Sequence, residues 1–327
     1  MSIKLFTHTD LDGMGCSIVA KHLFGDEFDL NDVEYCNYND INERVKEYFE
    51  KKKYKDYSHT FITDISINEE VAEIIQKAYM SNDTPHVKLI DHHKTALWLN
   101  DKYPMWSRVS VNDKKHPDNL SCGTSLFHYY LMSYNSSLIS KINPDYVFSN
   151  EALDKFVEIV RKYDTWEWKK VYNDEEPNRW NKLMKISGRE KFIDKVLKKL
   201  FINDVRINNE ELILLEDEEK NCKRYMNMKL KNLIIKDVCG YKSAVVFAER
   251  YLSELGNYIA EKCKEDIDMI VLINPSLSIS YRSIKEDIDV SKVASKFGGG
   301  GHKQASGSPI TDYGRECIVD LLFNNLI

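Results

Sequence analysis

The stretch IKLFTHTDLDG, residues 3–13, ends an apolar segment in a set of polar side chains. The segment IKLFTH is typical of a β-strand, and His8, Asp10 and Asp12 occupy alternating positions from its end. Alternate residues of an extended segment point the same way, so these three side chains can face one centre. A set of imidazole and carboxylate ligands suits a divalent ion such as Mn(II), and it differs from the thiolate ligands of a cysteine zinc site. We therefore predict a metal site at the end of this strand.

Two later runs repeat the arrangement of an apolar strand with a polar end. HTFITDIS leads to Asp64, and KLIDHHK leads to Asp91, His92 and His93. The amphipathic segments INERVKEYFEKK and NEEVAEIIQKAY lie between successive strands, and their apolar spacing is that of helices. Such alternation predicts a mainly parallel sheet with helices on both faces. Because ligands gather at the carboxyl ends of such strands, we expect the three clusters to lie together.

Each cluster taken alone has an ordinary alternative. A single aspartate at a strand end, such as Asp64, often caps a helix or stabilises a turn, and a pair of histidines is often a surface feature. Three clusters at the ends of successive strands favour a functional site, because uncompensated carboxylates would repel one another there. Bound cations would remove that repulsion, so the sequence predicts a site for divalent metal ions.

A long helix and a second domain follow the first. Residues 207–233 contain neither Gly nor Pro and are rich in Glu, Leu, Lys and Asn, which predicts one connecting helix. Strand and helix patterns then alternate again to the end of the chain. The predicted fold class is α/β, with a mainly parallel-sheet N-terminal domain at 1–205, a helical linker at 206–236 and a smaller α/β C-terminal domain at 237–327.

The run KFGGGGHKQASG, residues 296–307, places four consecutive glycines in that second domain, out of 13 in the chain. Glycine accepts positive φ and lets other groups approach the backbone closely. A glycine-rich loop can therefore present several backbone N–H groups to an anion, and His302 and Lys303 would add donors. An ordinary tight turn explains the glycines equally well on local chemistry alone.

Composition narrows the class of protein. Of the 327 residues, 43% are apolar and 30% charged, the balance of a globular rather than a disordered chain. The net charge of −6 argues against a broad basic face for long nucleic acid, but not against a small anionic substrate. Seven cysteines without C-x-x-C spacing argue against a disulfide framework and a cysteine zinc site. Short apolar runs and an acidic N-terminal segment predict a cytoplasmic protein with no membrane partner.

Four motifs together resemble the DHH phosphoesterase family, which is named after its Asp-His-His motif. HTDLDG, TDIS, DHHK and FGGGGHKQASG occur in the order and approximate spacing of that family. The resemblance covers nearly the whole chain, including a C-terminal domain similar to the DHH-associated domain. Within the family the chain looks most similar to the nanoRNase (NrnB-like) oligoribonuclease branch. The single Thr9 between His8 and Asp10 is similar to nuclease-like members and argues against a pyrophosphatase.

The resemblance implies a two-metal site in the first domain. Its six ligands would be His8 and Asp10 on one ion, Asp12 and His92 on the other, Asp64 bridging both, and Asp164 as a fourth carboxylate. Asp164 lies in RKYDTWEW, and Asp145 and Asp154 stay open as alternatives to it. His93 would face the substrate phosphate, and Asp91 would orient a neighbouring histidine from behind the metal ligands.

The resemblance also implies that the second domain holds the rest of the substrate. The residues assigned to this role are Arg282, Gly299, Gly300, Gly301, His302 and Lys303. Arg282 can give a bidentate phosphate contact, although a surface charge at a strand end is its ordinary interpretation. SCGTSLFHYY at 121–130 begins like a helix near the site, where capping and substrate contact are both open. Four tryptophans flank the motifs and could stack on bases, although core packing is expected for at least half of them: Trp98, Trp106, Trp166 and Trp168.

The implied activity is hydrolysis of short oligoribonucleotides, or of linear dinucleotides such as pApA, to mononucleotides. Two divalent ions, with manganese(II) predicted, can share a hydroxide near neutral pH, polarise the phosphoryl oxygens and neutralise the leaving alkoxide. The predicted partners are a short RNA or dinucleotide substrate and no membrane, and a homodimer stays open. Two alternatives are kept, a RecJ-like single-strand DNA exonuclease and a module that binds nucleotides without catalysis.

Overall fold

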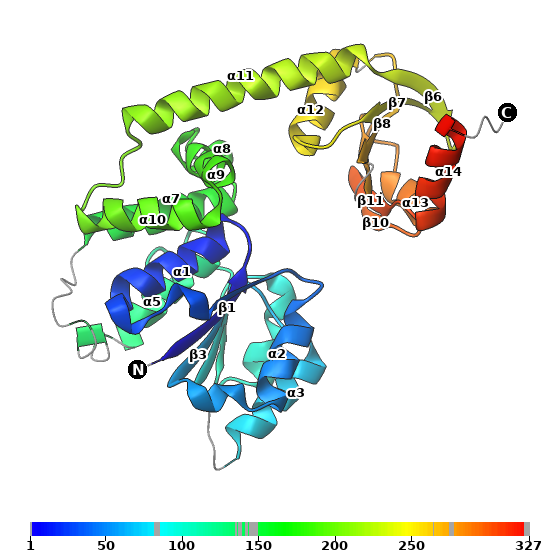
Figure 1. Ribbon diagram of the computed structural model, residues 1–327. Coiled ribbons are helices and arrows are strands. Elements are labelled where there is room, and N and C mark those ends of the chain that lie inside the picture. Colours follow the sequence, from blue (N-terminus) through cyan, green and yellow to red (C-terminus); the bar gives the residue numbers. More distant parts are fainter. Residues whose placement is uncertain are drawn as a thin grey trace. The chain divides into compact units, whose positions relative to one another are not determined.

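A five-stranded parallel sheet forms the centre of the first of two units, Met1–Leu215 (Figure 1). The computed structural model describes residues 2–81, 86–134, 136, 139–140, 143, 150–263, 265–274 and 278–323. The strand order is β2 (Val33–Cys36), β1 (Ile3–His8), β3 (His59–Thr63), β4 (Val87–Asp91) and β5 (Ser107–Val109). The predicted parallel sheet is confirmed, and it contains two short strands, β2 and β5, that the sequence analysis missed.

Helices cover both faces of this sheet, as the alternation of strands and helices predicts. Leu5 and Phe6 of β1 belong to two different apolar cores, so both faces of the strand are buried, as is usual for parallel sheets. One core includes residues of α1 (Leu11–Phe24), α5 (Gly123–Tyr134), α7 (Glu151–Asp164), α9 (Glu176–Ser187) and α10 (Arg189–Phe201). The other includes residues of α2 (Ile41–Glu50), α3 (Glu69–Tyr79) and α4 (Trp98–Lys102). A short helix, α8 (Glu167–Lys170), follows α7.

The chain turns sharply from β1 into α1, and this turn fixes the first polar cluster. Asp10 caps α1, because its side chain accepts hydrogen bonds from the backbone N–H groups of Asp12 and Gly13 at 3.1 and 3.0 Å. A β-carbon at Gly13 would lie 2.5 Å from the carbonyl carbon of His8, so no side chain fits there. Glycine therefore lets the first turn of α1 lie directly against the end of β1, which brings His8, Asp10 and Asp12 close together.

The second unit, Glu216–Ile327, contains a mixed six-stranded sheet. Its order is β10 (Gly300–His302), β11 (Ala305–Pro309), β9 (Ser278–Ser283), β8 (Met269–Asn274), β7 (Tyr241–Phe247) and β6 (Ile234–Val238). β7 pairs with β8 in parallel, and the other neighbours pair antiparallel. Its further helices are α12 (Leu252–Cys263), α13 (Val290–Ser295) and α14 (Asp312–Phe323). The helix expected at 207–233 is α11 (Asn209–Lys231), which crosses the boundary between the units along the sequence.

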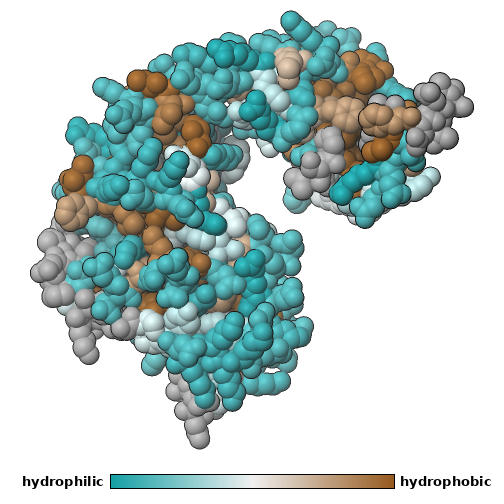
Figure 2. Space-filling view, in the orientation of Figure 1, coloured by the Kyte–Doolittle hydropathy of each residue, from teal (hydrophilic) through white to brown (hydrophobic). Residues whose placement is uncertain are grey.

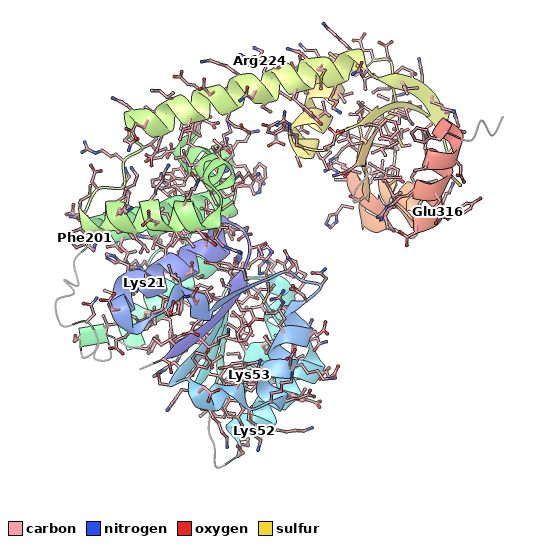
Figure 3. The ribbon with its side chains drawn as sticks, in the orientation of Figure 1. Lys21, Lys52, Lys53, Phe201, Arg224 and Glu316 are labelled. Carbon is pink, nitrogen blue, oxygen red and sulfur yellow. The ribbon has the colours of Figure 1, made fainter. Side chains whose placement is uncertain are left out.

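The surface of the first unit is polar over α2 and α3 (Figure 2). Lys52 and Lys53 lie between α2 and β3, at the amino ends of the strands, and are exposed (Figure 3). These two lysines are therefore at the opposite edge of the sheet from the three predicted clusters. Within the part of the chain that the structure describes, no helix has both the length and the apolar character needed to cross a membrane.

Candidate active site

The polar clusters at the ends of β1 and β3 form a first group of candidate metal ligands. The parallel register of β1, β3 and β4 aligns the carboxyl ends of these strands. His8 Nδ1 lies 2.8 Å from Asp10 Oδ2 and 4.0 Å from Asp64 Oδ2. One nitrogen or oxygen from each of His8, Asp10 and Asp64 lies within 4.8 Å of the other two. This distance permits one ion to contact all three side chains.

A second group lies beside the first and consists of Asp12, His92 and Asp164, whose ligand atoms are also within 4.8 Å of one another. His92 Nε2 is 3.7 Å from Asp12 Oδ2 and 3.7 Å from Asp164 Oδ2. The same nitrogen is 3.2 Å from Asp64 Oδ1. Asp64 thus directs Oδ1 toward the second group and Oδ2 toward His8 of the first group. The structure thus brings together the six residues that the DHH resemblance names as ligands, and their role as metal ligands stays a prediction.

The burial and the pKa values of Asp64 and Asp164 indicate whether these residues fit metal ions. Asp64 is 1% exposed, its φ is +58°, and its Oδ2 has no hydrogen-bond partner among the described residues. Burial and the charges of Asp12 and Asp10 raise the pKa of Asp64 well above its usual value. Burial and the charge of Asp12 likewise raise the pKa of Asp164 to about 8. Crowded buried carboxylates of this kind need compensating cations to ionise, so the donor set fits divalent ions.

The DHH motif itself divides into a buried anchor and two histidines with different roles. Asp91 is fully buried, and its Oδ1 accepts from the backbone N–H of His92 and from His93 Nδ1, each at 2.8 Å. Ser66 Oγ donates to Asp91 Oδ2 at 2.6 Å. Burial opposes ionisation of Asp91, but the hydrogen bond and charge of His93 hold its pKa below the usual range. Burial lowers the pKa of His92, which favours the neutral imidazole that binds metals.

Asp12 also holds the start of helix α5, a contact between distant parts of the chain. Its Oδ2 accepts from the backbone N–H of Gly123 at 2.5 Å, and its Oδ1 accepts from the N–H of Thr124 at 2.7 Å. Thr124 Oγ1 donates to the backbone carbonyl of Asp12 at 2.6 Å. Helix α5 therefore begins within the segment 121–130 at the edge of the site, and the first N–H groups of the helix stabilise the Asp12 carboxylate. A carboxylate has further lone pairs, so Asp12 can contact a metal ion as well.

The structure separates the candidates for the fourth carboxylate. Asp164, the last residue of α7, reaches His92, as described above. Asp154 lies in the first turn of the same helix and pairs with Lys115 Nζ at 2.6 Å instead. Asp145 lies outside the described residues. Of the two described candidates, Asp164 is the one brought to the cluster.

Comparison with known proteins decides the family. No family model matches the chain. Over 318 residues the chain is 36% identical to the oligoribonuclease NrnB of Bacillus subtilis (strain 168), and this covers 96% of the chain and 74% of that protein. The chain belongs to the DHH phosphoesterase family. As a member, it is a hydrolase of phosphoester bonds.

The chain is also similar to two further proteins. The chain is 21% identical to a 3′,5′-cyclic-nucleotide phosphodiesterase of Helicobacter pylori (strain ATCC 700392 / 26695), over 99% of both proteins. The crystal structure of exonuclease RecJ bound to manganese is similar with a TM-score of 0.53 and 16% identity, over 97% of this chain and 88% of that one. The RecJ similarity shows a shared fold, so the predicted DHH fold class is confirmed.

Tyr38 is a residue of the DHH site that the sequence analysis missed. Its hydroxyl lies 3.0 Å from His93 Nε2, its ring centroid is 5.1 Å from that of His8, and it is 58% exposed. Because His93 Nδ1 donates to the Asp91 carboxylate, a neutral His93 presents Nε2 as the acceptor of the Tyr38 hydroxyl. Tyr38 follows β2, one of the two strands that were missed. The carboxyl end of that strand is the signal that could have revealed it.

In the second unit of this DHH protein, the glycine run forms a hairpin of β10 and β11 rather than an open loop. A β-carbon at Gly299 would lie 2.6 Å from Ser308 Cα, and one at Gly301, where φ is +139°, would lie 2.7 Å from Ser306 Cα. These two glycines therefore permit close strand pairing. Gly300 is different, because a β-carbon there would meet none of the described residues within 4 Å.

The other residues assigned to substrate binding lie on the same sheet. Arg282 is half-buried on β9 opposite Ala305 of β11, and its Nη1 donates to the carbonyl of Tyr281 at 3.0 Å. His302 and Lys303 are exposed at the end of the hairpin. The sheet thus brings Arg282 and the hairpin together, as the sequence analysis expected, and their role in binding stays a prediction.

Proposed function

We propose that the chain is a metal-dependent phosphodiesterase that hydrolyses short oligoribonucleotides, or linear dinucleotides such as pApA, to mononucleotides. The observation that carries this proposal is the pair of neighbouring His/Asp groups, of which the first contains Asp64 and the second contacts it through His92. The support for the substrate class is the 36% identity to an oligoribonuclease over most of the chain. Manganese(II) as the metal and a cytoplasmic location stay predictions, and a homodimer stays open.

The proposed mechanism divides the work between the metal ligands and the DHH motif. Two divalent ions held by His8, Asp10, Asp64 and by Asp12, His92, Asp164 would supply Lewis-acid polarisation and an activated water. Asp91 holds His93 by the hydrogen bond to Nδ1, and this bond also raises the pKa of His93. A His93 that keeps both protons can donate from Nε2 to a phosphoryl oxygen. Asp64 lies between the two groups, with Oδ1 3.2 Å from His92 Nε2 and Oδ2 4.0 Å from His8 Nδ1, so it can link them.

Initial rates on a panel of substrates test the proposed function. The purified chain with Mn(II) should hydrolyse two- to five-nucleotide RNA and pApA faster than a 24-nucleotide single-stranded DNA, and EDTA should abolish the activity. Preference for the long DNA would support the RecJ-like alternative and overturn the proposal. Binding of short RNA without any turnover would instead support the non-catalytic module. His92→Ala is the control for contaminating nucleases, because it removes a ligand of the second group.

Tyr38→Phe is expected to lower kcat/KM for pApA by about 2- to 12-fold, the effect of one lost hydrogen bond. The variant keeps the ring beside His8 but removes the hydroxyl that contacts His93 Nε2. Tyr57→Phe is the matched control, because the Tyr57 hydroxyl bonds Asp32 at 2.7 Å and not a site residue. Steady-state kinetics of both variants check the prediction, and equal effects would contradict a role for Tyr38 in the site.

Two substitutions in the glycine run should separate substrate binding from folding of the second unit. Gly300→Val places a β-carbon where no residue of the described ranges lies within 4 Å, so we expect an unchanged melting temperature and a KM for pApA raised about tenfold or more. Gly301→Val requires φ of +139° and overlaps Ser306, so we expect loss of stability of the second unit. Thermal unfolding and kinetics of both variants make the comparison. A normal KM for Gly300→Val would show that the hairpin does not bind substrate.

A further inference from the structure

Trp166 is the exposed member of the five tryptophans, all of which lie in described segments. It is 56% exposed, whereas Trp106, Trp168 and Trp180 are buried and Trp98 is half-buried. A large aromatic ring gains most by leaving water. The exposed indole of Trp166 therefore contributes little to the core. Trp166 follows Asp164, a candidate metal ligand, by two positions.

The backbone at Trp166 is held in a conformation that disfavours a side chain. Its φ is +60° and ψ is +10°, in the left-handed region, which is unfavourable for a bulky residue. The N–H of Trp166 donates to the carbonyl of Tyr163 at 3.1 Å, and its carbonyl accepts from the N–H of Lys170 at 3.1 Å. Glycine would satisfy this turn without strain. The fold thus explains the turn but not the tryptophan.

A buried ion pair fixes the segment that carries both Asp164 and Trp166. Arg161 is 1% exposed, and its Nη1 donates to Glu167 Oε2 at 2.8 Å. Arg161 Nη1 also donates to the carbonyl of Leu120, and Glu167 Oε1 accepts from the N–H of Leu120 at 3.1 Å. The chain between Arg161 and Glu167 is therefore tied at both ends. It holds Asp164 at 3.7 Å from His92 and Trp166 in a constant position two residues further.

The ring of Trp166 is backed on one side by a second indole. Its centroid lies 6.2 Å from that of Trp168, and the two planes are inclined by 28°. Trp168 is buried, so it limits the movement of Trp166 from within the protein, while more than half of the Trp166 side chain remains open to solvent. A rigid, exposed aromatic face is the structure on which nucleobases stack.

We propose that Trp166 is a stacking platform for a base of the substrate next to the phosphate that is cleaved. The proposal rests on the proposed function and adds how the substrate is recognised. Every base has a π face, so stacking tolerates any base sequence. The enzyme should then distinguish substrates by the presence of a base beside the cleaved bond rather than by the identity of that base.

Steady-state kinetics of three Trp166 variants test the proposal. Trp166→Ala and Trp166→Gly should raise the KM for dinucleotides with any base by about 5- to 150-fold, the range for one lost base stack. Trp166→Phe should recover most of the affinity. Trp166→Gly should also melt at the same or a higher temperature, because it relieves the positive φ,. Tyr172→Ala, which removes a 42% exposed ring from the next turn, is the matched control.

The outcomes separate the stacking proposal from the proposed function. An abasic dinucleotide should show no difference between the parent and Trp166→Ala. If the parent hydrolyses dinucleotides and the KM of Trp166→Ala is unchanged, the stacking proposal is wrong and the function stands. A KM increase that comes with weaker Mn(II) binding, or that Tyr172→Ala shares, overturns it as well. If the parent hydrolyses none of the substrates, the proposed function is wrong. The stacking proposal is then tested by the affinity of the same variants for a dinucleotide with a non-hydrolysable linkage, which Trp166→Ala should weaken.

Discussion

Asp64→Asn is expected to lower the rate of pApA hydrolysis by about 10³-fold or more without unfolding the protein. The side chain lies between the two groups of candidate ligands, with Oδ1 3.2 Å from His92 Nε2 and Oδ2 4.0 Å from His8 Nδ1. Asparagine keeps the size of the side chain but removes the charge that a pair of divalent ions would share. Loss of one central ligand should disturb both ions together, and such effects on a site that acts as a unit are large.

The same substitution should leave the metal-free protein as stable as the parent, or more stable. Without metal, the Asp64 carboxylate is buried beside Asp12 and Asp10, and its pKa is raised well above the usual value. A neutral amide avoids that repulsion. Thermal unfolding with EDTA and with Mn(II) measures the difference. The parent should gain about 2.7 kcal/mol of stability at a metal concentration one hundred times the Kd, and Asp64→Asn should gain much less.

Asp154→Asn is the matched control for this prediction. Asp154 pairs with Lys115 at 2.6 Å in the first turn of α7, and its side chain is half exposed. Loss of an exposed pair costs little stability, about 0–1 kcal/mol, and leaves both groups of ligands intact. An Asp64→Asn variant that keeps both its activity and its stabilisation by Mn(II) would show that the metal site has been assigned to the wrong residues.

The proximity of the polar clusters in the first unit could be predicted because each cluster ends a strand with a strong apolar pattern. The carboxyl ends of parallel strands share one edge, so three strand ends were enough to bring His8, Asp64 and His92 together. The strands β2 and β5 could not be predicted in the same way. VEYC of β2 is half-buried over most of its length, and β5 has three residues. Tyr38 was missed because it follows β2.

Contacts between distant segments were the other feature hidden from the sequence. The hydrogen bonds from Gly123 and Thr124 to Asp12 join residues more than one hundred positions apart. The glycines at 299 and 301 were assigned to substrate binding from the sequence, and in the structure they permit close pairing with β11. Local patterns indicate where a backbone is permissive. They do not indicate which neighbour uses the space, because that depends on the tertiary fold.

Gly123→Ala should weaken metal binding by displacing the backbone of α5, because the substitution changes none of the candidate ligand side chains. A β-carbon at Gly123 would lie 2.8 Å from Asp64 Cα and 3.1 Å from Asp12 Oδ2. The first turn of α5 would have to move away from β3, and the N–H groups that hold the Asp12 carboxylate would move with it. Overpacking of this kind costs about 1–3 kcal/mol, and loss of hydrogen bonds to a charged group adds about 1.5–3 kcal/mol.

We therefore expect Gly123→Ala to lower the melting temperature and to weaken Mn(II) binding by about 10- to 100-fold, as loss of groups that orient metal ligands does. Thr124→Ser, which keeps the N–H and the hydroxyl that contact Asp12, should bind Mn(II) as the parent does. Isothermal titration of both variants with Mn(II) measures the effect. If Gly123→Ala loses stability but binds Mn(II) normally, the contact with α5 supports the fold and does not position Asp12 for the metal. If both properties change together, the start of α5 is part of the metal site, and glycine at 123 is required because Asp12 and Asp64 must lie against its backbone.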